Sequence, residues 1–135
     1  MEESLTNEES LTYKVIGCAL KVHHRLGPGL LESIYEKAML IELAKKNLKA
    51  KNQVPVDVIY DGVNLGEGLR IDILVEDELI VELKSVAHLT SIHFKQLQTY
   101  LKVTGKEVGM LINFNECDIM KGVKRVLKGQ YIPND

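Results

Sequence analysis

The 135-residue chain has no tryptophan and little cysteine, proline or aromatic character. Its two cysteines, Cys18 and Cys117, are too far apart to form a CxxC pair, which argues against a zinc site or a redox motif. No apolar run approaches the roughly 20 residues that cross a bilayer. The acidic start at Glu2 and Glu3 is unlike a secretory signal. We therefore expect a cytoplasmic protein with reduced thiols and no membrane partner.

An excess of positive charge is also missing. The net charge of −2 argues against a protein that coats nucleic acid through bulk electrostatics, but it is compatible with an enzyme that uses a local basic rim and a metal ion. A chain of this length encloses one hydrophobic core without disulfides. We expect a single domain over residues 11–128, an N-terminal segment of residues 1–10 that frays, and a C-terminal tail of residues 129–135.

The N-terminal third follows a helical period. Thr6 and Glu9 have capping-box spacing. Apolar residues then recur at helical spacing along one stripe, which comprises Leu11, Val15, Cys18, Val22 and Leu26. The glycines and proline at positions 27–29 end this helix, and a second helix is predicted from about Leu30 to Lys46.

The second predicted helix is apolar on two sides, which is typical of a well-buried helix. One apolar stripe comprises Leu30, Ile34, Ala38 and Ile41. The other comprises Tyr35, Met39 and Leu43. Glu32 falls on the side of the second stripe, so we expect its carboxylate to point into covered space.

The middle of the chain changes to a period of two, which indicates strands. Antiparallel strands are predicted over 53–60, 69–75 and 79–83, with turns at 61–62 and 76–78. A helix over 90–104, a buried strand over 108–114 and a final helix over 120–127 follow. The order predicts an α/β (α+β) domain in which a mixed sheet carries helices on its faces.

Four charged residues gather on the second predicted hairpin. Side chains alternate along a strand, so Arg70 and Asp72 share one face, and Glu82 and Lys84 share one face of the next strand. If the turn at 76–78 closes the hairpin, Asp72 lies opposite Glu82, and Arg70 lies opposite Lys84. Like charges in these positions destabilise a sheet.

A divalent cation between the two carboxylates would remove that repulsion. Mg²⁺ prefers one or two carboxylates together with waters and phosphate oxygens, and the backbone carbonyl of Leu83 could supply a further ligand. Lys84 beside such a metal could orient a water and stabilise phosphate charge. Two diagonal surface salt bridges, Arg70 with Glu82 and Lys84 with Asp72, would account for the same four residues equally well.

The predicted helix over 90–104 carries polar side chains on its expected buried face. His93, Gln96 and Tyr100 share one stripe there. Buried polar groups need partners, and an active site beneath the helix would provide them. The alternative is that Tyr100 is a core aromatic residue and that His93 caps a neighbouring loop, which is the favoured interpretation for His93. A glutamine such as Gln96 rarely belongs in a plain core.

Together these residues resemble the PD-(D/E)XK (restriction-endonuclease-like) nuclease superfamily and, within it, the GxxExxY protein family. The similarity covers about residues 10–128. The residues that match the GxxExxY, (D/E)XK and QxxxY motifs are, in chain order, Gly29, Glu32, Tyr35, Asp72, Glu82, Leu83, Lys84, Gln96 and Tyr100. Two features depart from the pattern: Ile71 stands where a proline often precedes the aspartate, and the cysteines of an iron–sulfur cluster are absent.

The resemblance implies an α-β-β-β-α-β core that hydrolyses phosphodiester bonds with Mg²⁺ or Mn²⁺. Asp72 and Glu82 would bind the metal with the Leu83 carbonyl, and Lys84 would be the catalytic lysine. Glu32 would be a third acidic ligand or would hold a water on the metal. The residues expected to support the site or to contact the substrate are Arg70, Gln96, Tyr100, Tyr35 and His93.

Three functions are compatible with this pattern. The first is a metal-dependent nuclease, of endonuclease type or otherwise, whose partner is nucleic acid and DNA in particular. The second is a non-catalytic module that keeps the nuclease fold and binds nucleic acid or protein, with a homodimer as one form. The third is a metal-dependent phosphatase or nucleotide hydrolase. Intact Asp72, Glu82 and Lys84 favour the first.

Overall fold

The computed structural model describes residues 7–135. Three α-helices, five strands and one turn of 3-10 helix follow one another along this part of the chain. In order they are α1 (Asn7–Leu26), α2 (Glu32–Lys45), β1 (Ala50–Tyr60), β2 (Val63–Val75), β3 (Leu79–Lys84), α3 (Ser91–Thr104), β4 (Val108–Asn113), η1 (Ile119–Gly122) and β5 (Val123–Leu127).

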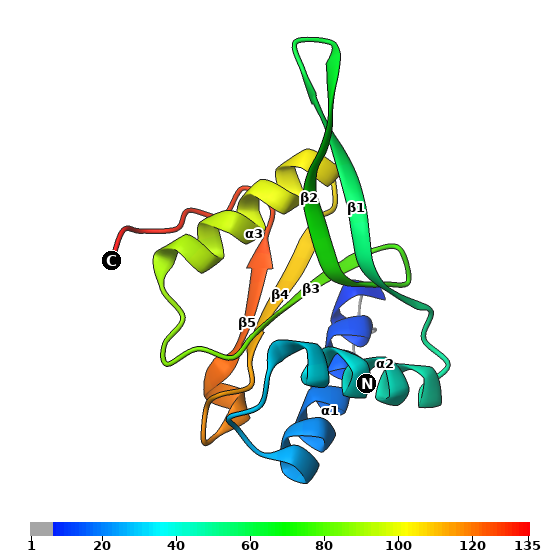
Figure 1. The fold of residues 1–135 in the computed structure, drawn as a ribbon, viewed down its shortest axis with the longest axis vertical. Coiled ribbons are helices and arrows are strands. Elements are labelled where there is room, and N and C mark those ends of the chain that lie inside the picture. Colours follow the sequence, from blue (N-terminus) through cyan, green and yellow to red (C-terminus); the bar gives the residue numbers. More distant parts are fainter. Residues whose placement is uncertain (1–6) are drawn as a thin grey trace, which may run out of the picture.

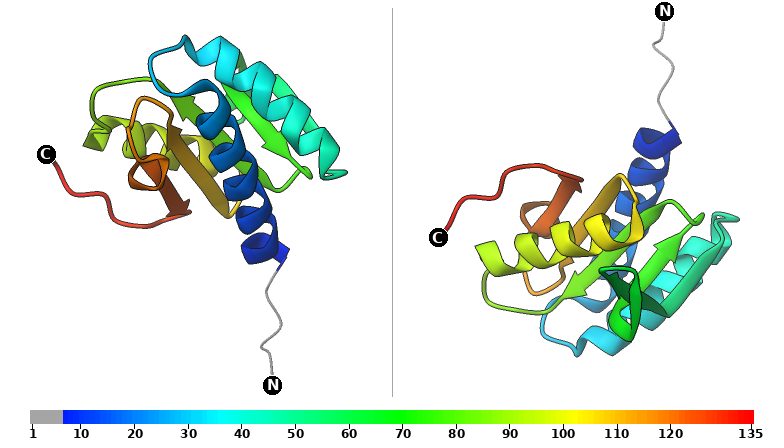
Figure 2. Two further views of the ribbon diagram at one scale, coloured as in Figure 1. Left: turned by 90° about the horizontal axis from the view of Figure 1, so that it is seen from below. Right: turned by 90° about the horizontal axis from the view of Figure 1, so that it is seen from above.

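The strands form one mixed sheet in the order β1-β2-β3-β4-β5. β3 and β4 are parallel and are joined by α3 as a crossover, while the other neighbours are antiparallel. Helices α1 and α2 cover one face and α3 covers the other (Figures 1 and 2). Each face has its own buried apolar cluster, so the predicted mixed sheet flanked by helices is confirmed.

The helix α1 packs as its stripe predicts, because Leu11, Val15, Cys18 and Val22 are all buried. Leu26, at the end of the stripe, is 41% exposed. Thr6, the predicted cap, lies outside the described residues. Residues 7–10, which we expected to fray, belong to the helix. No helix in the described part of the chain combines the length and the apolar character that a membrane span needs.

Helix α2 differs from the prediction of a helix buried on both sides. Its stripe of Tyr35, Met39 and Leu43 is fully buried, whereas Ile34 and Ile41 are 41% and 58% exposed. The reason is the layer architecture, because α2 is the outermost element on its face and has the sheet and α1 on one side only. One apolar face of α2 is therefore left uncovered.

The segment over 120–127 is a strand rather than the predicted helix. A single 3-10 turn at Ile119–Gly122 leads into β5, which pairs antiparallel with β4. Gly122 explains the tight turn, since a Cβ there would come within 2.5 Å of the Asn113 carbonyl oxygen. The strand completes the hydrogen bonding of β4, whose other edge already pairs with β3.

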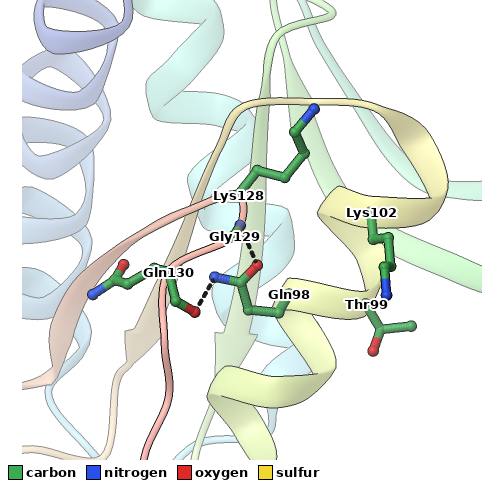
Figure 3. A pocket seen from close by; sticks show the side chains of 6 residues that line it. All are labelled: Gln98, Thr99, Lys102, Lys128, Gly129 and Gln130. Carbon is green, nitrogen blue, oxygen red and sulfur yellow. Dashed lines mark hydrogen bonds between the residues drawn. The ribbon is translucent and has the colours of Figure 1, made fainter.

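The C-terminal segment after β5 runs along α3, and Gln98 holds it there. The Gln98 amide donates to the carbonyls of Leu127 (2.6 Å) and Gln130 (3.0 Å), and its oxygen accepts from the Gly129 N–H (2.9 Å). A pocket of about 480 Å³ opens beside this contact (Figure 3). Its lining residues are Gln98, Thr99, Lys102, Lys128, Gly129 and Gln130, none of which belongs to the predicted site.

Close packing of α3 on β4 depends on Gly109. A Cβ at this position would lie 2.7 Å from a methyl of Leu97, which is itself 1% exposed. We expect Gly109→Ala to lower the free energy of unfolding by about 1–3 kcal/mol through overpacking. Urea denaturation measures the change.

Gly17→Ala is the matched control, because a Cβ at position 17 meets nothing within 4 Å. Gly17 lies inside α1, so alanine should raise the stability by about 0.5–1 kcal/mol. Equal effects of the two substitutions would contradict close packing at Gly109.

Candidate active site

The strands β2 and β3 diverge at Asp72 and form a fork. Their ladder consists of three pairs and ends with Ile73 opposite Val81. The next residues along the same register are Asp72 and Glu82, in agreement with the predicted hairpin. At this point side-chain carboxyl groups, rather than the neighbouring strand, accept the backbone hydrogen bonds. Glu82 Oε2 accepts from the Asp72 N–H (2.8 Å), and Asp72 Oδ2 accepts from the Leu83 N–H (2.9 Å).

At Asp72 the alternation of side chains along β2 is also interrupted, so that Ile71 and Ile73 lie on opposite faces of the sheet. Ile71 belongs to the apolar cluster beneath α3, whereas Ile73 belongs to the cluster beneath α1 and α2. On the β1 side, the ladder skips Gln53, which faces Asp72 in the register and has a left-handed φ of 51°. Asp72 therefore takes no part in the regular pairing of β2 with either neighbouring strand. Its carboxylate accepts the hydrogen bond from the Leu83 N–H instead.

Burial disfavours the state in which both carboxyl groups are ionised. Glu82 is 5% exposed. Burial first and the charge of Asp72 second raise the pKa of Glu82 to about 8. Burial also raises the pKa of Asp72, against the opposing effects of the Leu83 N–H and of Lys84. The pair consequently favours the partly protonated state at neutral pH.

Lys84 lies beside the fork at the end of β3. It is half-buried, and within the described residues it forms no ion pair. Its charge lowers the pKa of both Asp72 and Glu82. The ammonium group therefore remains available to a ligand of the two carboxylates.

The alternative of two diagonal salt bridges is wrong for this structure. Arg70 pairs with Glu67 (2.6 Å) instead of Glu82, and Lys84 has no ion-pair partner among residues 7–135. Arg70 also does not line up beside Lys84, since its half-exposed side chain is held by Glu67 on its own strand. The acidic pair thus lacks the neutralising partners that a purely structural role would provide.

Two of the three polar residues of α3 behave differently from the prediction of a common buried face. Gln96 is exposed, because the helix turns Leu97 and Leu101 to the sheet. His93 accepts from the Thr90 N–H (3.0 Å) and so caps the first turn of its own helix. His93 is therefore a capping residue, as predicted, but it caps its own helix rather than a neighbouring loop.

Tyr100 does reach the fork. It is half-buried, and its pKa is raised by burial and then by the charges of Glu82 and Asp72, while a hydrogen bond with the Arg70 backbone works the other way. The hydroxyl consequently lies close enough to the acidic pair for both charges to raise its pKa. Among the α3 residues named from the sequence, Tyr100 is the one that the fold places at the site.

Glu32 and Tyr35 lie in the first turn of α2. Glu32 is exposed, which corrects the expectation that it points into covered space, but its charge still raises the pKa of Asp72 and Glu82. Tyr35 is fully buried and stacks on Phe114, with 4.4 Å between ring centroids. Its hydroxyl donates to the Gly27 carbonyl (2.6 Å) and accepts from the Leu30 N–H (3.0 Å). Tyr35 thereby fixes the loop that presents Glu32.

Glu36 is a site residue that the sequence reasoning missed. It accepts from the amides of Gln53 (2.7 Å) and Asn52 (3.2 Å), which flank the break in the β1 ladder. Its charge contributes to the raised pKa of Asp72. The signal in the sequence is its spacing from Glu32, since residues four apart share a helix face.

Two further contacts hold the end of β3 in place. The Ser85 hydroxyl donates to the Leu30 carbonyl (2.8 Å), which ties the strand to the loop before α2. Asn113, which is fully buried, accepts from the Val86 N–H (3.1 Å) and donates to the Val86 carbonyl (2.9 Å). These contacts fix the backbone on either side of Lys84, and the sequence did not single out either residue for this role.

The donor set of the fork fits a magnesium-type cation. Asp72 and Glu82 supply the one or two carboxylates that Mg²⁺ prefers. Because the N–H and C=O of a strand residue point to the same edge and the Leu83 N–H meets Asp72, the Leu83 carbonyl also faces the fork. Residues 7–135 contain no cluster of three or more His, Cys, Asp or Glu side chains that could hold a metal, so a direct role for Glu32 stays a prediction.

Comparisons with known proteins assign the chain to a superfamily. A profile of the PD-(D/E)XK nuclease superfamily matches residues 9–126, and the chain therefore belongs to that superfamily. A crystal structure described as that of SSO0001 is similar, with a TM-score of 0.48, 19% sequence identity, and coverage of 89% of this chain and 68% of the other. No curated protein gives a significant match.

The raised pKa of Glu82 has a consequence for stability. The carboxyl group of an unfolded glutamate has a pKa near its usual value of 4.5, whereas burial and the charge of Asp72 raise the pKa of the folded Glu82 to about 8. The stability of the metal-free protein should therefore fall as the pH rises through this window. We expect Glu82→Gln to remove the fall and to be more stable than the wild type by about 2–4 kcal/mol at the upper end.

Urea denaturation across this pH range, with a chelator present, measures the effect. Glu78→Gln serves as the control, since Glu78 is an exposed carboxylate of the same hairpin. Parallel stability curves for the wild type and Glu82→Gln would contradict the raised pKa.

The contacts of Glu36 predict a second difference. Glu36→Ala removes two hydrogen bonds that hold the break in β1, so the free energy of unfolding should fall by about 1–2 kcal/mol. Glu32→Ala should change it by less than about 0.5 kcal/mol, because Glu32 is exposed and makes no described contact. Thermal denaturation compares the two, and a larger effect of Glu32→Ala would refute the assignment.

Proposed function

We propose that the chain is a metal-dependent nuclease that hydrolyses phosphodiester bonds of nucleic acid, DNA in particular, with Mg²⁺ or Mn²⁺ in the cytoplasm. The observation that carries the proposal is the fork, where two largely buried carboxyl groups lie together and neither forms an ion pair within the described residues. The GxxExxY motif at Gly29, Glu32 and Tyr35 supports membership of that family within the superfamily.

The residues of the fork have complementary roles in this proposal. Asp72, Glu82 and the Leu83 carbonyl would hold the cation, which would supply Lewis-acid stabilisation of the charge on the phosphoryl oxygens. The unpaired ammonium of Lys84 holds the attacking water and neutralises phosphate charge. The water oxygen forms a bond to phosphorus and gives up a proton, while the bond to the 3′ oxygen breaks and that oxygen takes up a proton, which leaves a 5′-phosphate and a 3′-hydroxyl.

The other named residues act around this centre. The Tyr100 hydroxyl lies within electrostatic range of both carboxyl groups and helps to orient the substrate. Arg70 and Gln96 are open enough to contact the substrate backbone. His93 and Tyr35 support the site through the backbone of α3 and of the loop before α2. Glu32 is close enough to contribute its charge, and we assign it a supporting acidic role.

The test is cleavage of labelled single-stranded and double-stranded DNA and RNA with Mg²⁺ or Mn²⁺. We expect cleavage by the wild type and a loss of at least ~100-fold for Asp72→Asn and Lys84→Met. Calorimetry should show metal binding by the wild type and Lys84→Met, and none by Asp72→Asn.

Glu78→Gln and Lys14→Met are the matched controls, since both side chains are exposed and lie outside the fork. They should cleave as the wild type does. Metal binding without cleavage of any polymer would overturn the nuclease and would favour a binding module with the same fold. Hydrolysis of nucleotides or phosphomonoesters alone would favour the small-substrate alternative.

A further inference from the structure

The strands β1 and β2 continue far beyond the rest of the sheet as a two-stranded ribbon, which we call the arm and define as residues 57–68 (Figure 1). No residue of the arm belongs to either buried cluster. An isolated two-stranded hairpin is only marginally stable in water. The arm nevertheless carries large apolar side chains in solvent: Ile59, Tyr60, Val63 and Leu65 are 59%, 72%, 59% and 62% exposed.

The arm has one apolar face and one mixed face. Tyr60 pairs with Val63 across the turn, and Leu65 lies two residues further along the same apolar face. The opposite face carries Ile59 and its pair Asn64, whose amide donates to the Asp57 carboxylate (3.1 Å). The face formed by Tyr60, Val63 and Leu65 has no covering element in the described chain, and an exposed patch of this kind marks an interaction site.

The charge of the arm excludes a polyanion as its partner. The arm contains Asp57, Asp61 and Glu67 and no lysine, arginine or histidine, and of these acidic residues Glu67 pairs with Arg70 at the base of the arm (2.6 Å). A surface that contacts nucleic-acid phosphates needs cations. The apolar face of an acidic arm fits instead a protein surface that is apolar and basic.

The outer face of α2 has this complementary character. Ile34, Lys37, Ala38, Ile41 and Lys45 follow one another at helical spacing on that face. Ile34 and Ile41 are 41% and 58% exposed. Lys45 pairs with Glu42 (3.4 Å), whereas Lys37 makes no ion pair within the described residues. Figure 1 shows the arm at one end of the molecule and α2 toward the other, so one chain cannot bring the two surfaces together.

We propose that two copies of the chain form a two-fold symmetric dimer in which each arm lies on the outer face of α2 of the other copy. A two-fold axis makes this contact twice, since each surface meets its complement on the partner. Apolar side chains of the arm cover Ile34 and Ile41. Asp61 at the turn of the arm, which like Lys37 forms no ion pair among residues 7–135, lies near Lys37. The dimer leaves the fork of each copy intact and does not depend on its activity.

Sedimentation velocity over a range of protein concentrations tests the proposal. The wild type should be a dimer, and Val63→Lys and Ile34→Lys should each give a monomer with an unchanged circular dichroism spectrum. Ile59→Lys is the matched control, because Ile59 has the same exposure as Val63 and lies on the opposite face of the arm. It should remain a dimer.

A wild type that stays monomeric at every concentration would overturn the proposal and would leave the arm to a different protein. A dimer that persists in Val63→Lys would exclude the arm from the interface. A dimer that is lost in Val63→Lys but kept in Ile34→Lys would overturn α2 as the surface that receives the arm.

Discussion

The architecture of the candidate site depends on one exchange of hydrogen bonds, in which the Glu82 carboxyl takes the N–H of Asp72 and the Asp72 carboxyl takes the N–H of Leu83. This exchange satisfies backbone donors that the diverging strands would otherwise leave unpaired. It also holds two acidic groups together at a place where both are short of solvent. The surrounding contacts of Glu36, Ser85 and Asn113 keep the fork in this form.

The apolar pattern of the sequence was sufficient to predict the layers and the second hairpin. The alternation over 69–75 and 79–83 sets the register, and the position of Asp72 relative to Glu82 follows from it. Strand alternation and the helical stripe singled out Lys84 and Tyr100, and resemblance to the nuclease superfamily added the roles that are expected of them. The fork itself was not predictable, because it depends on the left-handed Gln53 and on the interrupted alternation of β2.

The wrong predictions share a physical cause. The pattern of apolar residues within one element does not show which other element packs against it. Ile34 and Ile41 are apolar, but nothing in the described chain covers the outer face of α2. Gln96 is rotated to solvent because Leu97 packs against Gly109, a contact set by the tertiary fold. Residues 123–127 form the strand β5 instead of a helix because they hydrogen-bond to the edge of β4 that does not pair with β3.

The closeness of the two acidic residues along the chain affects how the site assembles. Asp72 and Glu82 are ten residues apart and are joined by a tight turn in which Glu76 and Asp77 adopt left-handed conformations. The entropy lost on closing so short a loop is small. The remaining free-energy cost of assembly is the repulsion between the two carboxylates, so protonation of one of them or a bound cation lowers this cost directly. The stability of this hairpin is thus tied to the ionic composition of its surroundings more closely than to the length of the chain that it must order.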